Sequence, residues 1–276
     1  MSDTVIPTWI NGQPGDRLPV SDRGLAYGDG LFETIRISSR GPVLLEYHLD
    51  RLEQGALRLG IPFSRTDVAA ELTAYPGLST VGIVKLILTR GSGGRGYACA
   101  DMGEPSRILS FHQWVDYPAR YYTQGIRIFP CCTRLGRNPQ LAGIKHLNRL
   151  EQVLARREWN GSDEFQEGLL CDDQGFVVEG VMSNLFLVEE GKILMPVLDQ
   201  CGVAGVMRRW LREQFSEQGL FVTETQITLD RFRVAAEVFF CNSVFGVWPV
   251  ARFQQSHWPV GPVSQLAQQL IRSHWF

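Results

Sequence analysis

Apolar residues recur at helical spacing in the first part of the chain. Leu49, Leu52 and Ala56 lie on one face of a predicted helix that ends at Gly60. A second helix is predicted to begin near Ser64, where the sequence resembles a capping box. With the strands that follow, these helices predict a first α/β unit.

Strand-like runs alternate with the helices. At the start, Asn11-Gly12 is a turn signal that predicts a hairpin between Trp9 and residues 18–24. Further strands are predicted around residues 31–37, 81–90, 107–114, 125–129, 167–170, 175–180, 183–188, 192–195, 221–227, 237–243 and 246–250. The pattern as a whole predicts an α/β fold of the α+β type.

Three more helices are predicted in the second half. Leu147, Leu150 and Val153 recur at helical spacing directly after Lys145, and this helix is expected to end near Asn160. Another helix is predicted from Val206, after a glycine-containing loop, and residues 263–275 are predicted to form a closing helix.

Length and apolar content favour two domains of ordinary size. The chain has 276 residues, of which 44% are apolar, so it can bury a substantial core. We expect an N-terminal α/β domain over residues 1–115, a linker over 116–123 and a C-terminal domain over 124–276.

Composition argues against several classes of partner. A net charge of −2 provides no basic field for nucleic acid. No apolar run approaches the roughly 20 residues that span a bilayer, and the polar start does not resemble a signal peptide. Six cysteines and five histidines show no metal-ligand spacing, so no metal site is predicted. We expect a cytoplasmic protein with reduced cysteines and a small-molecule substrate.

Lysine is rare, which limits where a reactive amine can lie. Of 27 basic residues only Lys85, Lys145 and Lys192 are lysines. Lys192 follows a turn and Lys85 lies within an apolar run, whereas Lys145 lies between a loop and a predicted helix. The positive end of a helix dipole weakens the hold of an amine on its proton. Lys145 is therefore a candidate Schiff-base lysine, although alone it also fits a solvated loop lysine.

Residues 91–96 match the G-x-G-x-x-G pattern of dinucleotide-binding loops. Such a site requires a helix directly after the glycines and an acidic residue about 20 positions further on. The residues that follow show no helical period, so we reject a nicotinamide site. We expect instead a flap that offers backbone N–H groups, Arg95 and Tyr97 to a bound anion.

Two further sequence features fit the binding of charged groups: a carboxylate at a strand end and a glycine-containing loop before a helix. Glu179 ends an apolar strand, so it fits either a buried carboxylate or a solvated turn glutamate. Gly202 and Gly205 lead into the helix at Val206, and the free N–H groups of a helix start can bind phosphate. An ordinary capped helix would have the same pattern.

Pyridoxal phosphate requires all of these groups at once. A lysine carries its aldehyde, cationic and backbone donors hold its phosphate, and an acid keeps its pyridine nitrogen protonated. Arg51, on the first predicted helix, adds the cation. The combination makes pyridoxal phosphate the expected cofactor.

Several stretches resemble the fold-type IV pyridoxal phosphate enzymes, which include branched-chain and D-amino-acid aminotransferases. They are residues 90–97, 134–153, 179, 184–186 and 198–208. Within this group the chain is most similar to the bacterial aminodeoxychorismate lyases, from Trp9 almost to the C-terminus. The resemblance implies a two-domain fold like that of D-amino-acid aminotransferase, and a homodimer.

Matching positions imply roles for individual residues. By resemblance, Lys145 is the Schiff-base lysine, Glu179 the partner of the pyridine nitrogen, and Arg51 the phosphate-binding arginine. Val206 and Met207 would bind phosphate through their backbone amides.

A side chain next to the phosphate is also implied, from Asn242 or Ser243. The aminotransferases usually present a threonine at this place, whereas this chain has Cys-Asn-Ser, so the assignment of Asn242 departs from the pattern of the family.

The resemblance implies a lyase of folate biosynthesis that converts 4-amino-4-deoxychorismate to p-aminobenzoate and pyruvate. Lys145 would anchor the cofactor and transfer a proton, and Arg95 and Tyr97 would hold the substrate carboxylates. Two alternatives use the same cofactor: a branched-chain or D-amino-acid aminotransferase, and a non-catalytic pyridoxal phosphate binder.

Overall fold

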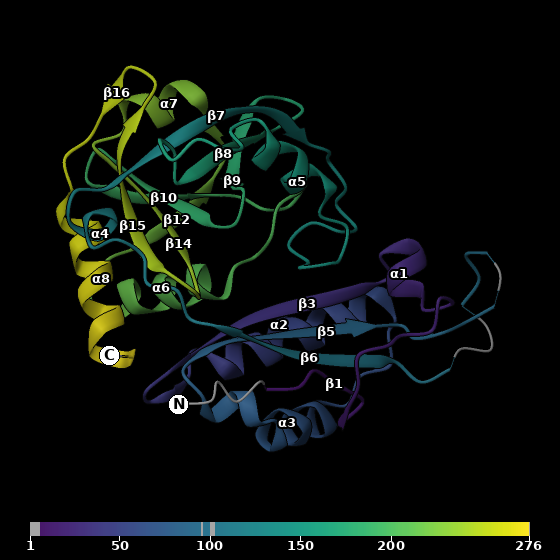
Figure 1. The fold of residues 1–276 in the computed structure, drawn as a ribbon. Coiled ribbons are helices and arrows are strands. Elements are labelled where there is room, and N and C mark those ends of the chain that lie inside the picture. The colour runs from purple at the N-terminus through teal and green to yellow at the C-terminus, as the bar shows by residue number, and fades with distance from the viewer. Residues whose placement is uncertain (1–5, 95, 100–102, 276) are drawn as a thin grey trace. The chain divides into compact units, whose positions relative to one another are not determined.

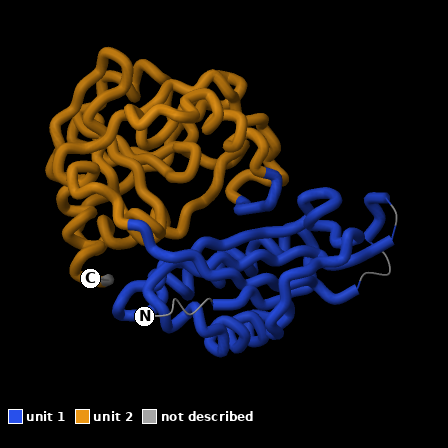
Figure 2. The backbone as a smooth tube through the Cα atoms, in the orientation of Figure 1, with its two compact units in different colours: residues 1–115, 144–148, 275–276 blue, residues 116–143, 149–274 orange. Residues whose placement is uncertain are grey.

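The computed structural model describes residues 6–94, 96–99 and 103–275, and the chain forms two compact units (Figure 2). Unit 1 comprises residues 1–115, 144–148 and 275–276, and unit 2 comprises residues 116–143 and 149–274. The chain thus leaves unit 2 after Gly143, adds a short segment to unit 1 and returns to unit 2 at Arg149. The expected domain and linker boundaries stay a prediction.

Unit 1 is built on a six-stranded antiparallel sheet of order β2-β1-β6-β5-β3-β4 (Figure 1). Its strands are β1 Trp9–Ile10, β2 Gln13–Pro14, β3 Gly30–Ser38, β4 Gly41–Pro42, β5 Gly82–Thr89 and β6 Ser106–Gln113. Alternate residues of β5, among them Val84 and Leu86, are buried in a core with Leu49 and Leu52 of the neighbouring helix. The period of two in the sequence therefore marks the face that packs on helices.

The helices of unit 1 follow the sequence pattern. They are α1 Arg23–Tyr27, α2 Leu45–Leu59, α3 Arg65–Ala74 and the 3₁₀ turn Pro76–Ser79. Gly60 ends α2 with a φ of 63°, and the Ser64 side chain accepts a hydrogen bond from the backbone of Asp67, so both predicted helix signals are confirmed. The predicted hairpin turn at Asn11-Gly12 is also confirmed, but its second strand is Gln13–Pro14 rather than residues 18–24.

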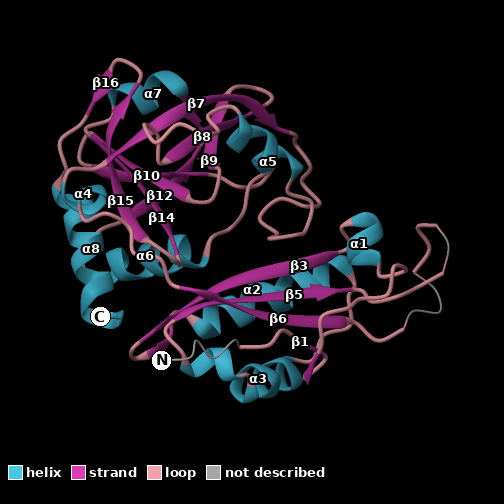
Figure 3. Ribbon diagram, in the orientation of Figure 1, coloured by secondary structure: helices cyan, strands magenta, loops and turns pink. Residues whose placement is uncertain are grey.

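Unit 2 contains a ten-stranded mixed sheet (Figure 3). Its strands are β7 Ile126–Leu135, β8 Glu167–Asp172, β9 Phe176–Gly180, β10 Asn184–Glu189, β11 Lys192–Pro196, β12 Val222–Thr225, β13 Ile227–Thr228, β14 Glu237–Asn242, β15 Gly246–Phe253 and β16 Ser256–His257. The main path runs β12-β11-β10-β14-β15-β7-β8-β9-β13, with β16 beside β15. β7 pairs in parallel with both β8 and β15, and β11 pairs in parallel with β12.

The helices of unit 2 are α4 Arg120–Thr123, α5 Leu150–Arg157, α6 Val206–Glu217, α7 Leu229–Val234 and α8 Pro262–Trp275. Two of the predicted helices, at Val206 and at residues 263–275, are confirmed. The third begins later than expected, because α5 starts at Leu150 rather than directly after Lys145. Among the described residues, no helix has both the length and the apolar composition to cross a membrane.

Candidate active site

Lys145 lies in an extended segment at the edge of β3 in unit 1. The backbone N–H of Phe32 donates to the Lys145 carbonyl at 3.1 Å, and Leu147 N–H donates to the Gly30 carbonyl at 3.0 Å. The Lys145 Nζ lies 4.2 Å from the centre of the Phe32 ring. The expectation that Lys145 lies at the mouth of a helix is therefore wrong. Strand-like pairing, rather than a helix N-terminus, fixes its backbone.

A second lysine approaches the same aromatic ring. Lys85 lies in the middle of β5, opposite Thr34 of β3, and its Nζ is 5.5 Å from the centre of the Phe32 ring. Unit 1 therefore carries two amines next to Phe32. Lys85 is half-buried and lies on the face of β5 opposite to that of the buried Val84 and Leu86.

Arg51 belongs to a buried cluster with Glu33 and His48. Arg51 Nε donates to Glu33 Oε1 at 2.8 Å, and His48 Nδ1 lies 2.6 Å from Glu33 Oε2. Burial acts to raise the pKa of Glu33, but Arg51 and His48 outweigh it and hold that pKa at about 2. Burial lowers the pKa of His48, and the nearby charges of Arg51 and Lys145 lower it further against the opposing pull of Glu33. The cluster therefore holds an ionised Glu33 between His48 and an oriented guanidinium.

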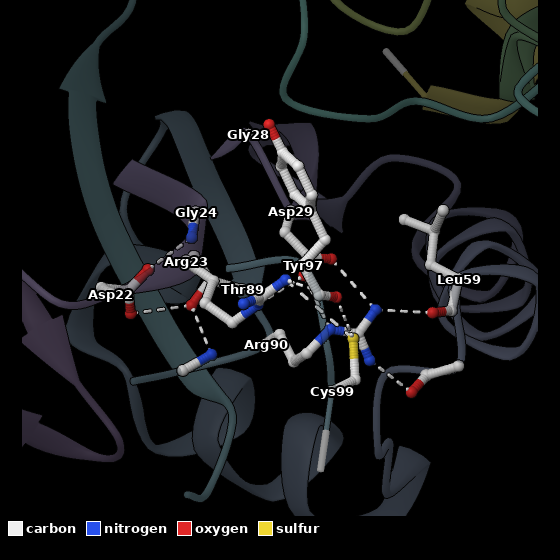
Figure 4. Close-up of polar contacts among 12 residues, drawn as sticks. Asp22, Arg23, Gly24, Gly28, Asp29, Leu59, Thr89, Arg90, Tyr97 and Cys99 are labelled. Atoms are coloured by element: carbon white, nitrogen blue, oxygen red, sulfur yellow. Dashed lines mark hydrogen bonds and ion pairs between the residues drawn. The ribbon is translucent and has the colours of Figure 1, made fainter. Parts of the chain in front are cut away.

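The glycine loop after β5 is anchored by a polar network (Figure 4). Arg23 and Arg90 both contact Asp29 Oδ2, at 3.0 and 2.7 Å. Arg23 Nη1 also donates to the carbonyl of Gly96 at 2.9 Å. Two arginines that share one carboxylate thus fix the base of the loop.

The predicted substrate-binding residues lie in this loop. The side chain of Tyr97 is 84% exposed, and its ring centre lies 5.5 Å from that of Tyr27. Arg95 lies outside the described residues. Between β5 and β6 the described part of the loop contains no helix.

Glu179 is a buried carboxylate at the end of β9 in unit 2. It is 4% exposed, and its Oε2 accepts a hydrogen bond from Val203 N–H at 2.8 Å. Gln152 Nε2 lies 3.5 Å from Oε1. The buried alternative for Glu179 is confirmed, and one oxygen is fixed by the backbone of a distant loop. Such a carboxylate suits the protonated nitrogen of a buried ring.

The N-terminus of α6 lies at the end of that same loop. Val206 and Met207 are its first residues, and the cap is Gly205, which has no side chain that could make a capping hydrogen bond. The first N–H groups of a helix lack intrahelical acceptors, so they can bind an anion. Val206 and Met207 thus begin a helix, as expected, and their phosphate-binding role stays a prediction.

Asn242 ends β14 in unit 2, and Ser243 follows it. The Asn242 side chain accepts from Val244 and Phe245 N–H at 2.9 Å and donates to the Met182 carbonyl at 3.1 Å. Asn242 thus ties its own turn to the turn after Glu179. These bonds give Asn242 a structural task, and its proposed phosphate contact stays a prediction.

The cysteines fit the expectation of reduced thiols. All six are free, and the adjacent Cys131 and Cys132 are buried and exposed respectively, as strand alternation predicts. Burial raises the pKa of Cys131 to about 12, so it does not supply a thiolate at neutral pH.

Sequence reasoning missed the residues that orient the candidates. Glu33, His48 and Val203 lie far along the chain from the groups they contact, and no local motif marks them. Glu33 offered the strongest signal, since it is a charged residue at an inward position of an alternating strand.

The groups present fit pyridoxal phosphate. Unit 1 offers the Lys145 amine and the Arg51 guanidinium, while unit 2 offers the buried Glu179 carboxylate and the α6 N-terminus. They match the aldehyde, phosphate and pyridine nitrogen of the cofactor.

Comparisons with known proteins give the same picture. Residues 30–253 match the model of the amino-transferase class IV family. Aminodeoxychorismate lyase of Vibrio harveyi is 36% identical over 95% of this chain and 97% of its own length. A putative branched-chain-amino-acid aminotransferase of Methanocaldococcus jannaschii is 32% identical over 88% of this chain and 86% of its own.

Solved structures include one with high similarity. The crystal structure of 4-amino-4-deoxychorismate lyase from Pseudomonas aeruginosa is 48% identical, with a TM-score of 0.93 over 96% of this chain and 98% of that chain.

Proposed function

The chain belongs to the class IV aminotransferase family, and we propose that it is a pyridoxal phosphate-dependent lyase that converts 4-amino-4-deoxychorismate to p-aminobenzoate and pyruvate. Its likeness to two lyases, at 36% and 48% identity over nearly the whole chain, is the observation that carries the proposal. Membership of the family alone does not choose the reaction, because the family also contains aminotransferases.

We propose the following roles for the residues. When bound, pyridoxal phosphate supplies an aldehyde for an amine and a ring that accepts electrons. Lys145 holds the cofactor through its amine and, once released, takes a proton from the substrate carbon. Glu179, oriented by Val203 N–H, keeps a proton on the ring nitrogen. Negative charge that develops during the reaction is thereby stabilised.

The phosphate group needs cationic and N–H donors. We propose that Arg51 and the backbone amides of Val206 and Met207 supply them, with Ser243 or Asn242 adding a side chain. Glu33 supports this role, because it holds two nitrogens of the Arg51 guanidinium in one orientation.

The substrate carboxylates need partners of their own. We propose Arg95 and Tyr97 for this task. The exposed phenol of Tyr97, on a loop whose base Arg23 fixes, supports the assignment.

One assay separates the lyase from its rivals. Purified protein loaded with pyridoxal phosphate is given 4-amino-4-deoxychorismate without any 2-oxo acid, and p-aminobenzoate and pyruvate are quantified over many turnovers. A lyase releases both in equal and continuing amounts, because it consumes no amino acceptor. A single turnover, with the cofactor spectrum shifting on addition of leucine or D-alanine, would instead identify an aminotransferase.

We also propose that the enzyme acts in the cytoplasm as a homodimer. The resemblance to the fold-type IV enzymes supports both statements.

A further inference from the structure

The loop at residues 202–205 connects several parts of unit 2. Val203 N–H donates to Glu179 Oε2 at 2.8 Å, and the Val203 carbonyl accepts from Asn184 Nδ2 at 2.8 Å. Both polar groups of one peptide residue are therefore held by buried side chains. The Val203 carbonyl, held by Asn184, and the Val203 N–H, which faces Glu179, belong to the same residue. The hydrogen bond from Asn184 therefore controls the direction in which this N–H points.

The same loop holds the backbone that leads to Lys145. Gly143 N–H donates to the Gly202 carbonyl at 2.9 Å, and Ala204 N–H donates to the Gly143 carbonyl at 3.0 Å. Gly143 precedes Lys145 by two residues. A shift of the loop at residues 202–205 would therefore move Gly143, which leads to Lys145, as well as Val203, which donates to Glu179.

The loop ends at Gly205, the cap of α6. Gly205 has φ −65° and ψ 140°, a conformation open to any residue. A Cβ atom there would collide with Oδ1 of Asn184. Packing against Asn184, rather than backbone conformation, therefore requires glycine at this position.

Asn184 itself sits on a rigid support. It is 6% exposed and begins β10, directly after a turn held by the fully buried Glu167. Glu167 accepts from Val181 N–H at 3.0 Å and from the Ser183 hydroxyl at 2.5 Å. The Asn184 amide is thus fixed from the sheet side and can impose its position on the loop.

We propose that Asn184 is a positioning residue that fixes the loop at residues 202–205, and through it the carboxylate of Glu179 and the N-terminus of α6. This inference rests on the proposed function, in which these two groups hold opposite ends of one cofactor. Asn184 touches neither reacting atom. It keeps a constant distance between Glu179, the proposed partner of the ring nitrogen, and the N-terminus of α6, the proposed phosphate donor.

The test compares Asn184→Ala and Asn184→Asp with the exposed control Asn160→Ala. Asp keeps the size of the side chain but places an acceptor against the Val203 carbonyl. In cofactor-free full-length protein, amide hydrogen exchange of residues 202–206 should become roughly tenfold faster in both variants, while β5 and α8 exchange as before. Affinity for pyridoxal phosphate should fall by about tenfold, with a shifted visible absorption band.

Three results would overturn the proposal. Exchange of residues 202–206 within twofold of the native protein in both variants would do so. Uniformly faster exchange over the whole chain would make Asn184 a general stability residue. Faster exchange of residues 202–206, with unchanged affinity for pyridoxal phosphate and an unchanged absorption spectrum, would show that the position of the loop does not affect cofactor binding. The exchange measurement needs no cofactor, so a failure of the proposed function, seen as native protein that binds no pyridoxal phosphate, is distinguishable.

A second variant checks the contact directly. Gly205→Ala should speed loop exchange in the native background, but add little in the Asn184→Ala background, where the colliding oxygen is absent. Additive effects of the two substitutions would contradict the packing that the proposal assumes.

Discussion

At the scale of single residues, the chemistry depends on one lysine among very few. Lys145→Ala should abolish sodium borohydride-stable attachment of pyridoxal phosphate and lower turnover by at least roughly a thousandfold, because the substitution removes the amine that is proposed to form the imine. Lys192→Ala is the matched control, since Lys192 is exposed at the start of β11. Attachment mapped by mass spectrometry to Lys85 in the Lys145 variant would contradict the assignment.

The buried Glu33 should make stability depend on acid pH. Its pKa is held at about 2 against an ordinary value of 4.5, so the unfolded chain takes up the proton first as pH falls. The stabilisation is therefore complete above pH 4.5 and is lost between pH 4.5 and 2. Glu33→Gln should lower the free energy of unfolding at pH 7 by about 3 kcal/mol, because Arg51 and His48 lose their charged partner.

Denaturant unfolding of both proteins between pH 3 and 7 measures this effect. The difference between native protein and Glu33→Gln should shrink as pH falls, while the exposed control Glu190→Gln stays level with the native protein. A difference that is constant over this range would show that the Glu33 pKa is not depressed.

Glu167 should have the opposite pH dependence. Burial raises its pKa to about 7 from 4.5, although the Ser183 hydroxyl and three backbone N–H groups lower it. The folded protein keeps this proton while the unfolded chain has lost it, so the contribution of Glu167 to stability decreases as pH rises from 4.5 to 7. Glu167→Gln removes the titration. Between pH 4.5 and 7, the free energy of unfolding of the variant should rise by on the order of 3 kcal/mol relative to that of the native protein. A difference in the free energy of unfolding between the two proteins that stays constant from pH 4.5 to 7 would refute the raised pKa of Glu167.

At the scale of elements, the start of α6 can be tested without disturbing the helix. Val206 is the first helical residue, a position where proline is tolerated, and the extended conformation of Gly205 suits a following proline. Val206→Pro removes one N–H while the helix remains. Val206→Ala keeps the N–H and loses similar packing, so it is the matched control.

The proline variant should bind pyridoxal phosphate about tenfold more weakly than the alanine variant, with similar melting temperatures for the two cofactor-free proteins. Equilibrium titration by cofactor fluorescence gives both affinities. Equal affinities would remove the Val206 amide from the phosphate site.

At the scale of the whole molecule, each of the two compact units is made of separate stretches of the sequence. Residues 144–148 belong to unit 1 although residues before and after them belong to unit 2. The Lys145 backbone therefore pairs with Phe32 of β3 and belongs to the same unit as Arg51, whereas Glu179 and the α6 N-terminus belong to unit 2.

The proposed homodimer is tested at the same scale. Sedimentation should give a mass of about twice the 31.1 kDa of one chain over a broad range of concentrations. A monomer that is fully active in the lyase assay would refute the homodimer while leaving the proposed reaction intact.

Local signals were enough to determine much of this protein from its sequence. Ser64 and Gly60 marked helix ends, the alternation in β5 marked a buried face, and the scarcity of lysine directed attention to Lys145. These inferences held because capping, side-chain alternation and composition act over a few residues. The motifs around them pointed to the family by resemblance.

Only the tertiary structure decided how the candidate groups are held. It placed Lys145 on the edge of β3 rather than at a helix start, joined Glu33 to Arg51, and brought Val203 to Glu179. Each of these contacts joins residues that are distant in sequence, through sheet register and loop packing. No local pattern encodes such a contact, because it exists only once the chain has closed the loops between its partners.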